Sequence, residues 1–92
     1  MEDLPAVTAL GMIYPNPFNP TATIPVNLSQ GGHVKLTVYD LRGRLVRTLQ
    51  DGALAAGNHN FTFRGDGLGS GAYICRFETP QGVETQRIML VK

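Results

Sequence analysis

Apolar and polar residues alternate with a period of two over most of this chain, and no other feature limits its fold as strongly. Between Thr21 and Leu28 every second residue is apolar, and the same alternation returns in residues 33–39, 59–64 and 73–77. Side chains of a strand point alternately to opposite faces, so this pattern predicts strands with one buried face. The segments between them are too short for the crossover helix that neighbouring parallel strands require. The sequence therefore predicts an all-β fold of antiparallel strands.

Six segments have strand character, and a seventh is expected near the N-terminus. They are residues 21–28, 33–39, 44–49, 59–64, 73–77 and 83–91, with residues 9–14 as the seventh. Pro25 predicts an edge strand or a bulge, and the adjacent Leu45 and Val46 predict a bulge or twist. Within residues 50–58, Gly52 and Gly57 bound the stretch ALAA, and we predict that residues 50–58 form a loop. The strand spacing indicates an immunoglobulin-like antiparallel β-sandwich of about seven strands.

The predicted core consists of the apolar residues that share one face of each strand. They are Ile24, Val26, Leu36, Val38, Phe61, Phe63, Tyr73, Cys75 and Phe77. Cys75 is the single cysteine, so we expect no internal disulfide and interpret this residue as a small buried hydrophobe. Gly71 precedes a strand after a short glycine-rich segment, and we expect a positive φ at or beside it.

Composition and charge exclude several classes of function. The 92 residues make one domain, and a net charge of +1 gives no electrostatic reason to expect nucleic acid or an anionic membrane as a partner. No apolar run approaches the roughly 20 residues that span a bilayer. The opening MEDLPAV lacks the regions of a signal peptide, so an export leader would lie elsewhere. His33 and His59 lack metal-ligand spacing and the acidic residues are scattered, so we expect neither catalysis nor a metal or cofactor.

The segment YPNPFNP, residues 14–20, places three prolines directly before the first clear strand. Proline fixes φ, lacks an N–H donor and disfavours the helical region for the residue before it. The segment must therefore be extended or turning, and we interpret it as a stiff connector anchored by the rings of Tyr14 and Phe18. We expect residues 1–13 to be a linker or leader into the first strand and residues 14–92 to form a monomeric sandwich.

The last predicted strand is apolar on both faces between two cationic residues. Its end consists of Arg87, Ile88, Met89, Leu90, Val91 and Lys92. A strand of an ordinary sandwich has one polar face. Two interpretations remain open. A loop or the proline segment covers the second face, or the strand is presented to a partner through its carboxyl end or its exposed edge.

Four motifs occur in order along the chain. They are YPNPFNP before a TATI strand, VYDLRGRLV, LGSGAY and the ending QRIMLVK. Together they resemble the C-terminal sorting domain of type IX secretion cargo, and the middle motifs are shared with an immunoglobulin-like module of flagellar hook-capping proteins. Besides residues 87–92, the residues that carry the resemblance are Tyr14, Pro15, Asn16, Pro17, Phe18, Tyr39, Asp40, Gly43, Arg44, Gly71 and Tyr73.

The resemblance implies a non-catalytic address label on an N-terminal cargo protein. Such domains pass through the periplasm and are recognised by the type IX translocon of Bacteroidetes-type bacteria. A sortase-like peptidase commonly removes them as the cargo reaches the outer-membrane surface or the medium. On this reading residues 87–92 are what the translocon recognises. The alternative is a structural or adhesive immunoglobulin-like module, such as a hook-cap scaffold or an accessory domain of a modular enzyme. A hook-cap domain would continue on both sides, whereas we expect Lys92 to be the native terminus.

Overall fold

The computed structural model describes residues 7–92, and this part of the chain contains seven strands and no helix. Residues 1–6 of the expected linker lie outside the described residues. The strands are β1 (Ala9–Leu10), β2 (Thr21–Leu28), β3 (Gly32–Asp40), β4 (Leu45–Leu54), β5 (Gly57–Arg64), β6 (Gly71–Thr79) and β7 (Gly82–Leu90).

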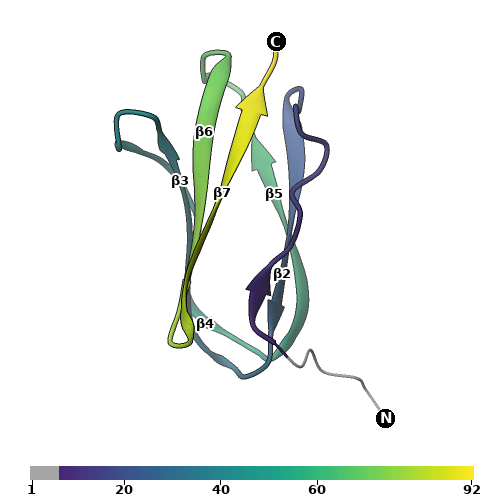
Figure 1. Ribbon diagram of the computed structural model, residues 1–92, viewed down its shortest axis with the longest axis vertical. Helices are drawn as coiled ribbons and strands as arrows, with labels where there is room; N and C mark the ends of the chain where they lie inside the picture. Colours follow the sequence, from purple (N-terminus) through teal and green to yellow (C-terminus); the bar gives the residue numbers. More distant parts are fainter. Residues whose placement is uncertain (1–6) are drawn as a thin grey trace.

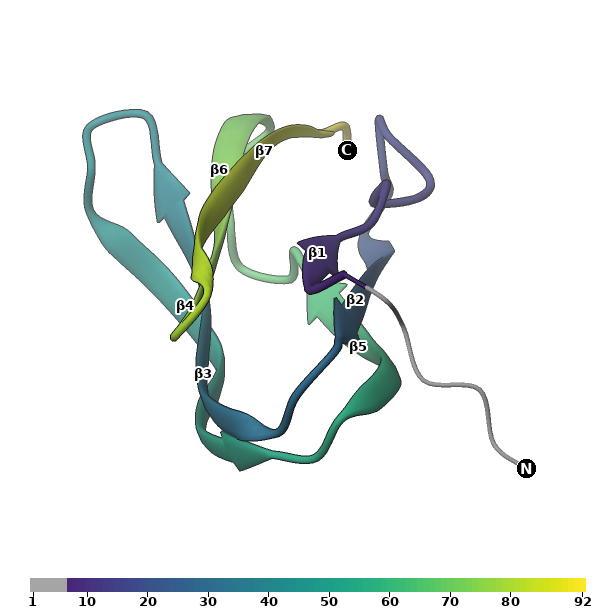
Figure 2. The same ribbon diagram turned by 60° about the horizontal axis from the view of Figure 1, so that its bottom comes forward.

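The strands form two sheets that pack face to face (Figures 1 and 2). One sheet has the order β1-β2-β5 and the other the order β4-β3-β6-β7. All the paired strands are antiparallel, as the short connections require. This arrangement confirms the predicted immunoglobulin-like sandwich.

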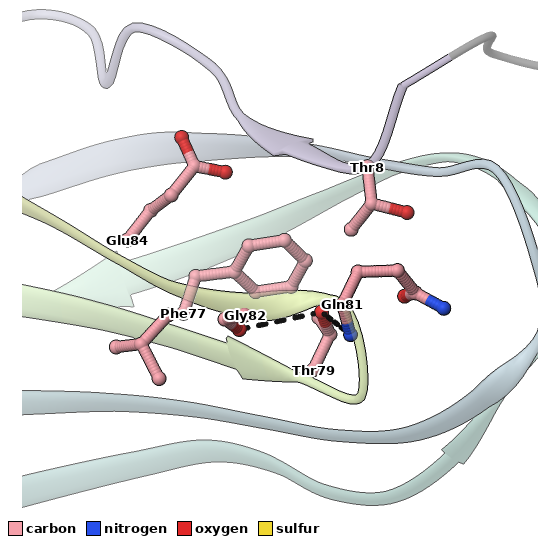
Figure 3. A pocket seen from close by; sticks show the side chains of 7 residues that line it. Thr8, Phe77, Thr79, Gln81, Gly82 and Glu84 are labelled. Atoms are coloured by element: carbon pink, nitrogen blue, oxygen red, sulfur yellow. Dashed lines mark hydrogen bonds between the residues drawn. The ribbon is translucent and has the colours of Figure 1, made fainter.

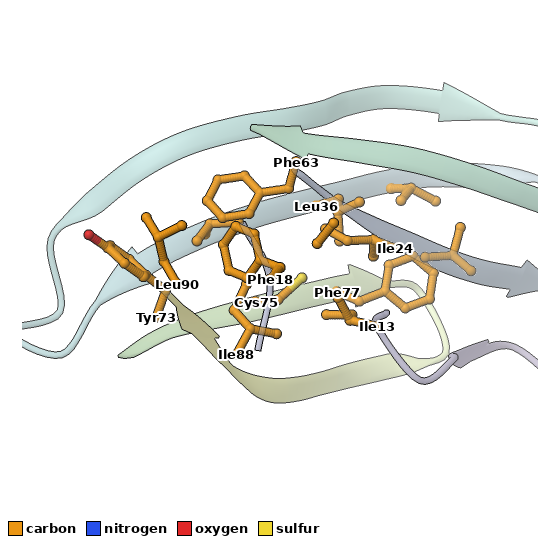
Figure 4. Packing of buried hydrophobic residues seen from close by; sticks show 14 of the residues in the cluster. Ile13, Phe18, Ile24, Leu36, Phe63, Tyr73, Cys75, Phe77, Ile88 and Leu90 are labelled. Carbon is orange, nitrogen blue, oxygen red and sulfur yellow. The ribbon is translucent and has the colours of Figure 1, made fainter. Parts of the chain in front are cut away.

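The core lies between the sheets and confirms eight of the nine predicted positions (Figure 4). The exception is Phe61, which packs against the core but is only half-buried. β5 is the outer strand of its sheet, so the Phe61 ring has a neighbouring strand on one side only. Phe63, two residues later, is fully buried against the ring of Phe18, with ring centroids 5.4 Å apart.

The core also takes in residues that the alternation of the strands does not indicate. Ile13 and Phe18, which both precede β2, are almost completely buried. β1 and Ile13, which both lie before residue 14, pack on the sandwich.

The prediction of a loop over residues 50–58 is wrong. β4 continues to Leu54 and β5 begins at Gly57, which leaves two residues to cross from one sheet to the other. β3 is long enough to pair with β4 as far as Gly32 opposite Leu54, and the Leu54 side chain packs against the core. Strand pairing and burial outweigh the local preference of the glycines.

The irregularity predicted in β4 is present, whereas the one predicted in β2 is not. The β3–β4 register shifts twice, leaving Val46 and Leu49 without a direct partner, as expected of bulges. Pro25 lies on β2 where pairing with the two-residue β1 has just ended. β2 is the middle strand of its sheet and its register with β5 is regular at Pro25, so the prediction of an edge strand or a bulge is wrong there. The missing N–H of Pro25 is tolerated because the ladder with β1 has ended.

Candidate functional site

The four sequence motifs meet at one end of the sandwich. Figure 1 shows at its upper end the proline segment, the β3–β4 turn, the start of β6 and the C-terminus. The strand register also brings three of the motifs together, because Asp40 lies opposite Tyr73 and Tyr73 lies opposite Ile88. We call this part of the molecule the motif end. Residues separated by more than seventy positions therefore contribute to one surface.

The terminal strand has one buried and one exposed face. Ile88 and Leu90 are buried in the core, whereas Met89 is 37% exposed and Val91 46% exposed. Arg87 and Lys92 are also exposed. No described segment covers the outer apolar face, which removes the first of the two interpretations of this strand.

The proline segment lies along the edge of β7 instead of its face. Phe18 N–H donates to the Met89 carbonyl at 2.9 Å, and Val91 N–H donates to the Phe18 carbonyl at 3.0 Å. The Asn16 amide adds two bonds, because its Nδ2 donates to the Arg87 carbonyl at 3.1 Å and its Oδ1 accepts from Met89 N–H at 3.0 Å. Asn16 thus does with its side chain what a neighbouring strand would do with its backbone.

The same seam continues towards β1. Gln86 Nε2 donates to the Gly11 carbonyl at 2.9 Å, and Gln86 Oε1 accepts from Ile13 N–H at 2.8 Å. Gly11 N–H donates to the Pro25 carbonyl, but proline has no N–H to offer in return, so the Gly11 carbonyl is available to Gln86. The edge of β7 is therefore occupied between Gln86 and Val91. The expectation of an exposed edge for strand addition is wrong there.

One anchor of the proline segment was predicted correctly and the other was not. Phe18 is buried, but the Tyr14 side chain is 54% exposed. Tyr14 instead exchanges two main-chain hydrogen bonds with Thr23, and the neighbouring Ile13 provides the buried side chain. The apolar β-branched residue immediately before YPNPFNP was the available signal.

The Asp40 carboxylate organises the turn after β3. Its Oδ1 accepts from the main-chain N–H groups of Arg42 and Arg44, and its Oδ2 accepts from Arg44 Nε at 3.1 Å. Gly43 provides the positive φ of 86° that the turn needs. The main-chain donor of Arg44 is the largest cause that lowers the pKa of Asp40. These contacts explain the Asp, Gly and Arg of the VYDLRGR motif.

The LGSGAY motif closes the connection from β5 to β6. Tyr73 Oη donates to the Gly69 carbonyl at 2.6 Å, four residues upstream, which is the tyrosine corner typical of immunoglobulin-like sandwiches. Gly71 has φ of +146°, as predicted. Ser70 Oγ accepts from Lys92 N–H at 3.2 Å and so contacts the end of the terminal segment.

A family comparison covers nearly all of the described chain. The model of the secretion system C-terminal sorting domain matches residues 12–92. The chain belongs to this family. No curated protein and no solved structure matches the chain.

This membership makes the chain a type IX sorting domain, the tail by which a cargo protein is directed to the type IX machinery. It implies export to the cell surface or secretion. It also favours sorting over the alternative of a structural or adhesive module.

Reactive groups of the sorting domain do not form a site at the motif end. His33 Nε2 lies 2.9 Å from Asp51 Oδ1, and His59 Nε2 lies 2.8 Å from the Ala55 carbonyl. Burial raises the pKa of the Cys75 thiol to about 12, so this thiol is protonated at neutral pH. Within residues 7–92, no three His, Cys, Asp or Glu side chains gather as metal ligands would. That part of the chain likewise has no helix suited to crossing a membrane.

A small pocket of about 130 Å³ lies at the opposite end of the sorting domain (Figure 3). Thr8 and Phe77 line it together with the β6–β7 turn. Small-molecule sites usually measure about 300–1,000 Å³. This pocket is remote from the four motifs, so we do not connect it with sorting.

Proposed function

We propose that residues 87–92 are the part of this sorting domain that the type IX translocon reads, and that the sandwich holds them in place. The proposal rests on one observation, which is that the side chains of the terminal strand alternate between the core and solvent. Ile88 and Leu90 fix it in the core, while Met89 and Val91 leave an apolar surface in solvent between Arg87 and Lys92. An exposed apolar strip with cationic ends is suited to binding a partner.

The position of the chain ends supports this reading. β1 lies towards the lower end of Figure 1, and β7 runs to the upper end. Thr8 lies beside the β6–β7 turn, so a cargo protein attached before β1 would enter from that end. This placement favours access of a partner to residues 87–92. The division into residues 1–13 and residues 14–92 remains a prediction for the full-length protein, in which β1 and Ile13 belong to the connection and pack on the sandwich.

Further details belong to the same proposal. The domain is monomeric and non-catalytic, and it acts only as a label. It passes through the periplasm with its cargo, and a sortase-like peptidase removes it at the outer-membrane surface or during release into the medium.

The test is an export assay in a bacterium with type IX secretion. Residues 4–92 are fused behind a reporter that carries its own inner-membrane leader. The intact fusion should reach the surface or the medium, and a fusion lacking residues 89–92 should stay in the periplasm. A strain without the type IX machinery should retain both. Because the deletion removes the buried Leu90, circular dichroism must show that the truncated domain is folded. Export of a folded truncation at the level of the intact fusion would contradict the proposal.

A further inference from the structure

The outer face of the four-stranded sheet changes character along its length. Strand pairing places side chains of one face in rows across β4, β3, β6 and β7. The row nearest the β6–β7 turn is mostly charged and consists of Asp51, Lys35, Glu78 and Val83. The next row is polar and consists of Thr48, Thr37, Arg76 and Thr85. The row nearest the motif end is mainly apolar and consists of Leu45, Tyr39, Ile74 and Arg87.

This last row continues into an apolar patch. Ala72 and Met89, paired across β6 and β7, follow it towards the motif end. We call Tyr39, Leu45, Ala72, Ile74, Arg87 and Met89 the outer patch. Leu45 is 53% exposed, and Tyr39, Ala72 and Ile74 are half-buried, so the patch offers continuous apolar surface to solvent. Contiguous exposed apolar surface, unlike a scattered leucine, indicates an interaction site.

Cations gather around the same end, although the chain as a whole is nearly neutral. Six of the eight Lys and Arg residues belong to the motif end. Arg42 and Arg44 lie in the β3–β4 turn, Arg47 donates to the Asp66 carbonyl, Arg64 ends β5, Arg87 lies near the end of β7 and Lys92 contacts Ser70. Two acidic residues accompany them, since Asp40 accepts from the turn at Arg42 and Asp66 Oδ2 lies 3.9 Å from Arg64 Nη1. The Asp40 carboxylate is already occupied by the turn and by Arg44. The motif end therefore carries an excess of positive charge that the net charge of +1 conceals.

From these observations we propose that the outer patch is a docking surface for a protein partner whose surface is acidic around an apolar centre. This rests on the proposed function and adds to it, because the partner would contact β3, β4 and β6 as well as the terminal strand. Five of the six cations are arginines, whose planar guanidinium group can donate two parallel hydrogen bonds to one carboxylate. Tyrosine, methionine and arginine are also the residues that protein interfaces favour.

The test uses residues that lie outside residues 87–92. Leu45→Glu puts a carboxylate in the patch, and Arg42→Glu reverses a charge beside it. Val83→Glu and Lys35→Glu are the matched controls, because they make the same kinds of change in the charged row of the same sheet face. Each variant is placed in the reporter fusion of residues 4–92, and its thermal unfolding is measured to show that it is folded.

We expect Leu45→Glu and Arg42→Glu each to lower export by about tenfold, the effect of losing one good interface contact. The two controls should leave export unchanged. Equal export of all four folded variants would overturn the proposal. If deletion of residues 89–92 still abolished export in that case, the sorting role would stand and only the patch would fail.

Two further measurements separate other occupants of the patch. The purified domain is floated with vesicles of phosphatidylethanolamine and phosphatidylglycerol, and its mass is measured by analytical ultracentrifugation. A monomer that does not bind vesicles is the expected result. Vesicle binding lost in Leu45→Glu would assign the patch to a lipid surface, and a dimer lost in Leu45→Glu would assign it to a second copy of the chain. Either result would overturn the proposal of an acidic protein partner.

Discussion

Phe63 and Phe61 lie two residues apart on β5, yet they differ in burial, and this difference gives a matched test at the scale of single residues. Phe63 is fully buried against Phe18, whereas Phe61 is half-buried. Phe63→Ala should lower the free energy of unfolding by about 3–5 kcal/mol. Phe61→Ala should lower it clearly less. Chemical denaturation measures both, and an unchanged midpoint in Phe63→Ala would contradict the core as described.

Asp40 gives a residue-scale prediction about pH. Its pKa is lowered in the folded state, so its charge stabilises the fold above the ordinary carboxyl pKa of about 3.9. This contribution is lost as the pH falls through the lowered pKa. Asp40→Asn keeps an Oδ1 that can accept from Arg42 and Arg44 but removes the charge. Below about pH 4, the variant should lose less of its stability on acidification than the wild type. Parallel acid-unfolding curves for the two proteins would show that Asp40 has no such role.

At the scale of single residues, the sequence predicted the burial of side chains that follow the alternation of a strand. It did not predict the roles of side chains that depend on contacts with distant parts of the chain. The inward residues of β2, β3 and β6 follow directly from their period of two. The roles of Ile13 and Gln86 depend on how the segment before β2 lies on β7. No local pattern encodes that approach.

At the scale of elements, the proline segment and β7 stabilise each other through Asn16. Asn16→Ala removes the two bonds to Arg87 and Met89, so the amide of Met89 should exchange hydrogen with solvent faster. Amides in the middle of β3 should be unaffected. Asn19→Ala is the matched control, because Asn19 is an exposed asparagine three residues later in the same segment. Native-state hydrogen exchange measures the effect. Equal protection of Met89 in both variants would show that the Asn16 bonds do not hold this edge.

The elements themselves were predicted unevenly, for a physical reason. The long alternating β2 has the predicted bounds, and the predicted residues 73–77 form the middle of the longer β6. The prediction of a loop over the second half of β4 rests on Gly52 and Gly57, which favour turns locally, but pairing with β3 keeps this half of β4 extended. The two-residue β1 exists only because β2 lies beside it. Short or glycine-rich strands are stabilised by pairing with a neighbouring strand, and the identity of that strand cannot be read from the local sequence.

At the scale of the whole molecule, the sandwich brings four separated motifs to one end. Phe18 and Asn16 hold the edge of β7, Tyr73 closes the β5–β6 connection and Asp40 shapes the neighbouring turn. The core then fixes alternate residues of the terminal strand and leaves the others in solvent. The motifs that mark the family are thus explained chiefly as the support of residues 87–92.

The most direct test of this account changes only the exposed side chains of the terminal strand. Met89→Ser together with Val91→Ser keeps Ile88 and Leu90 in the core, which a deletion does not. Val83→Ser, an exposed valine at the far end of β7, is the control. Export of the reporter fused to residues 4–92 is measured for both folded variants in a bacterium with type IX secretion. We predict that the double variant stays in the periplasm and that Val83→Ser is exported normally. Normal export of the folded double variant would contradict it.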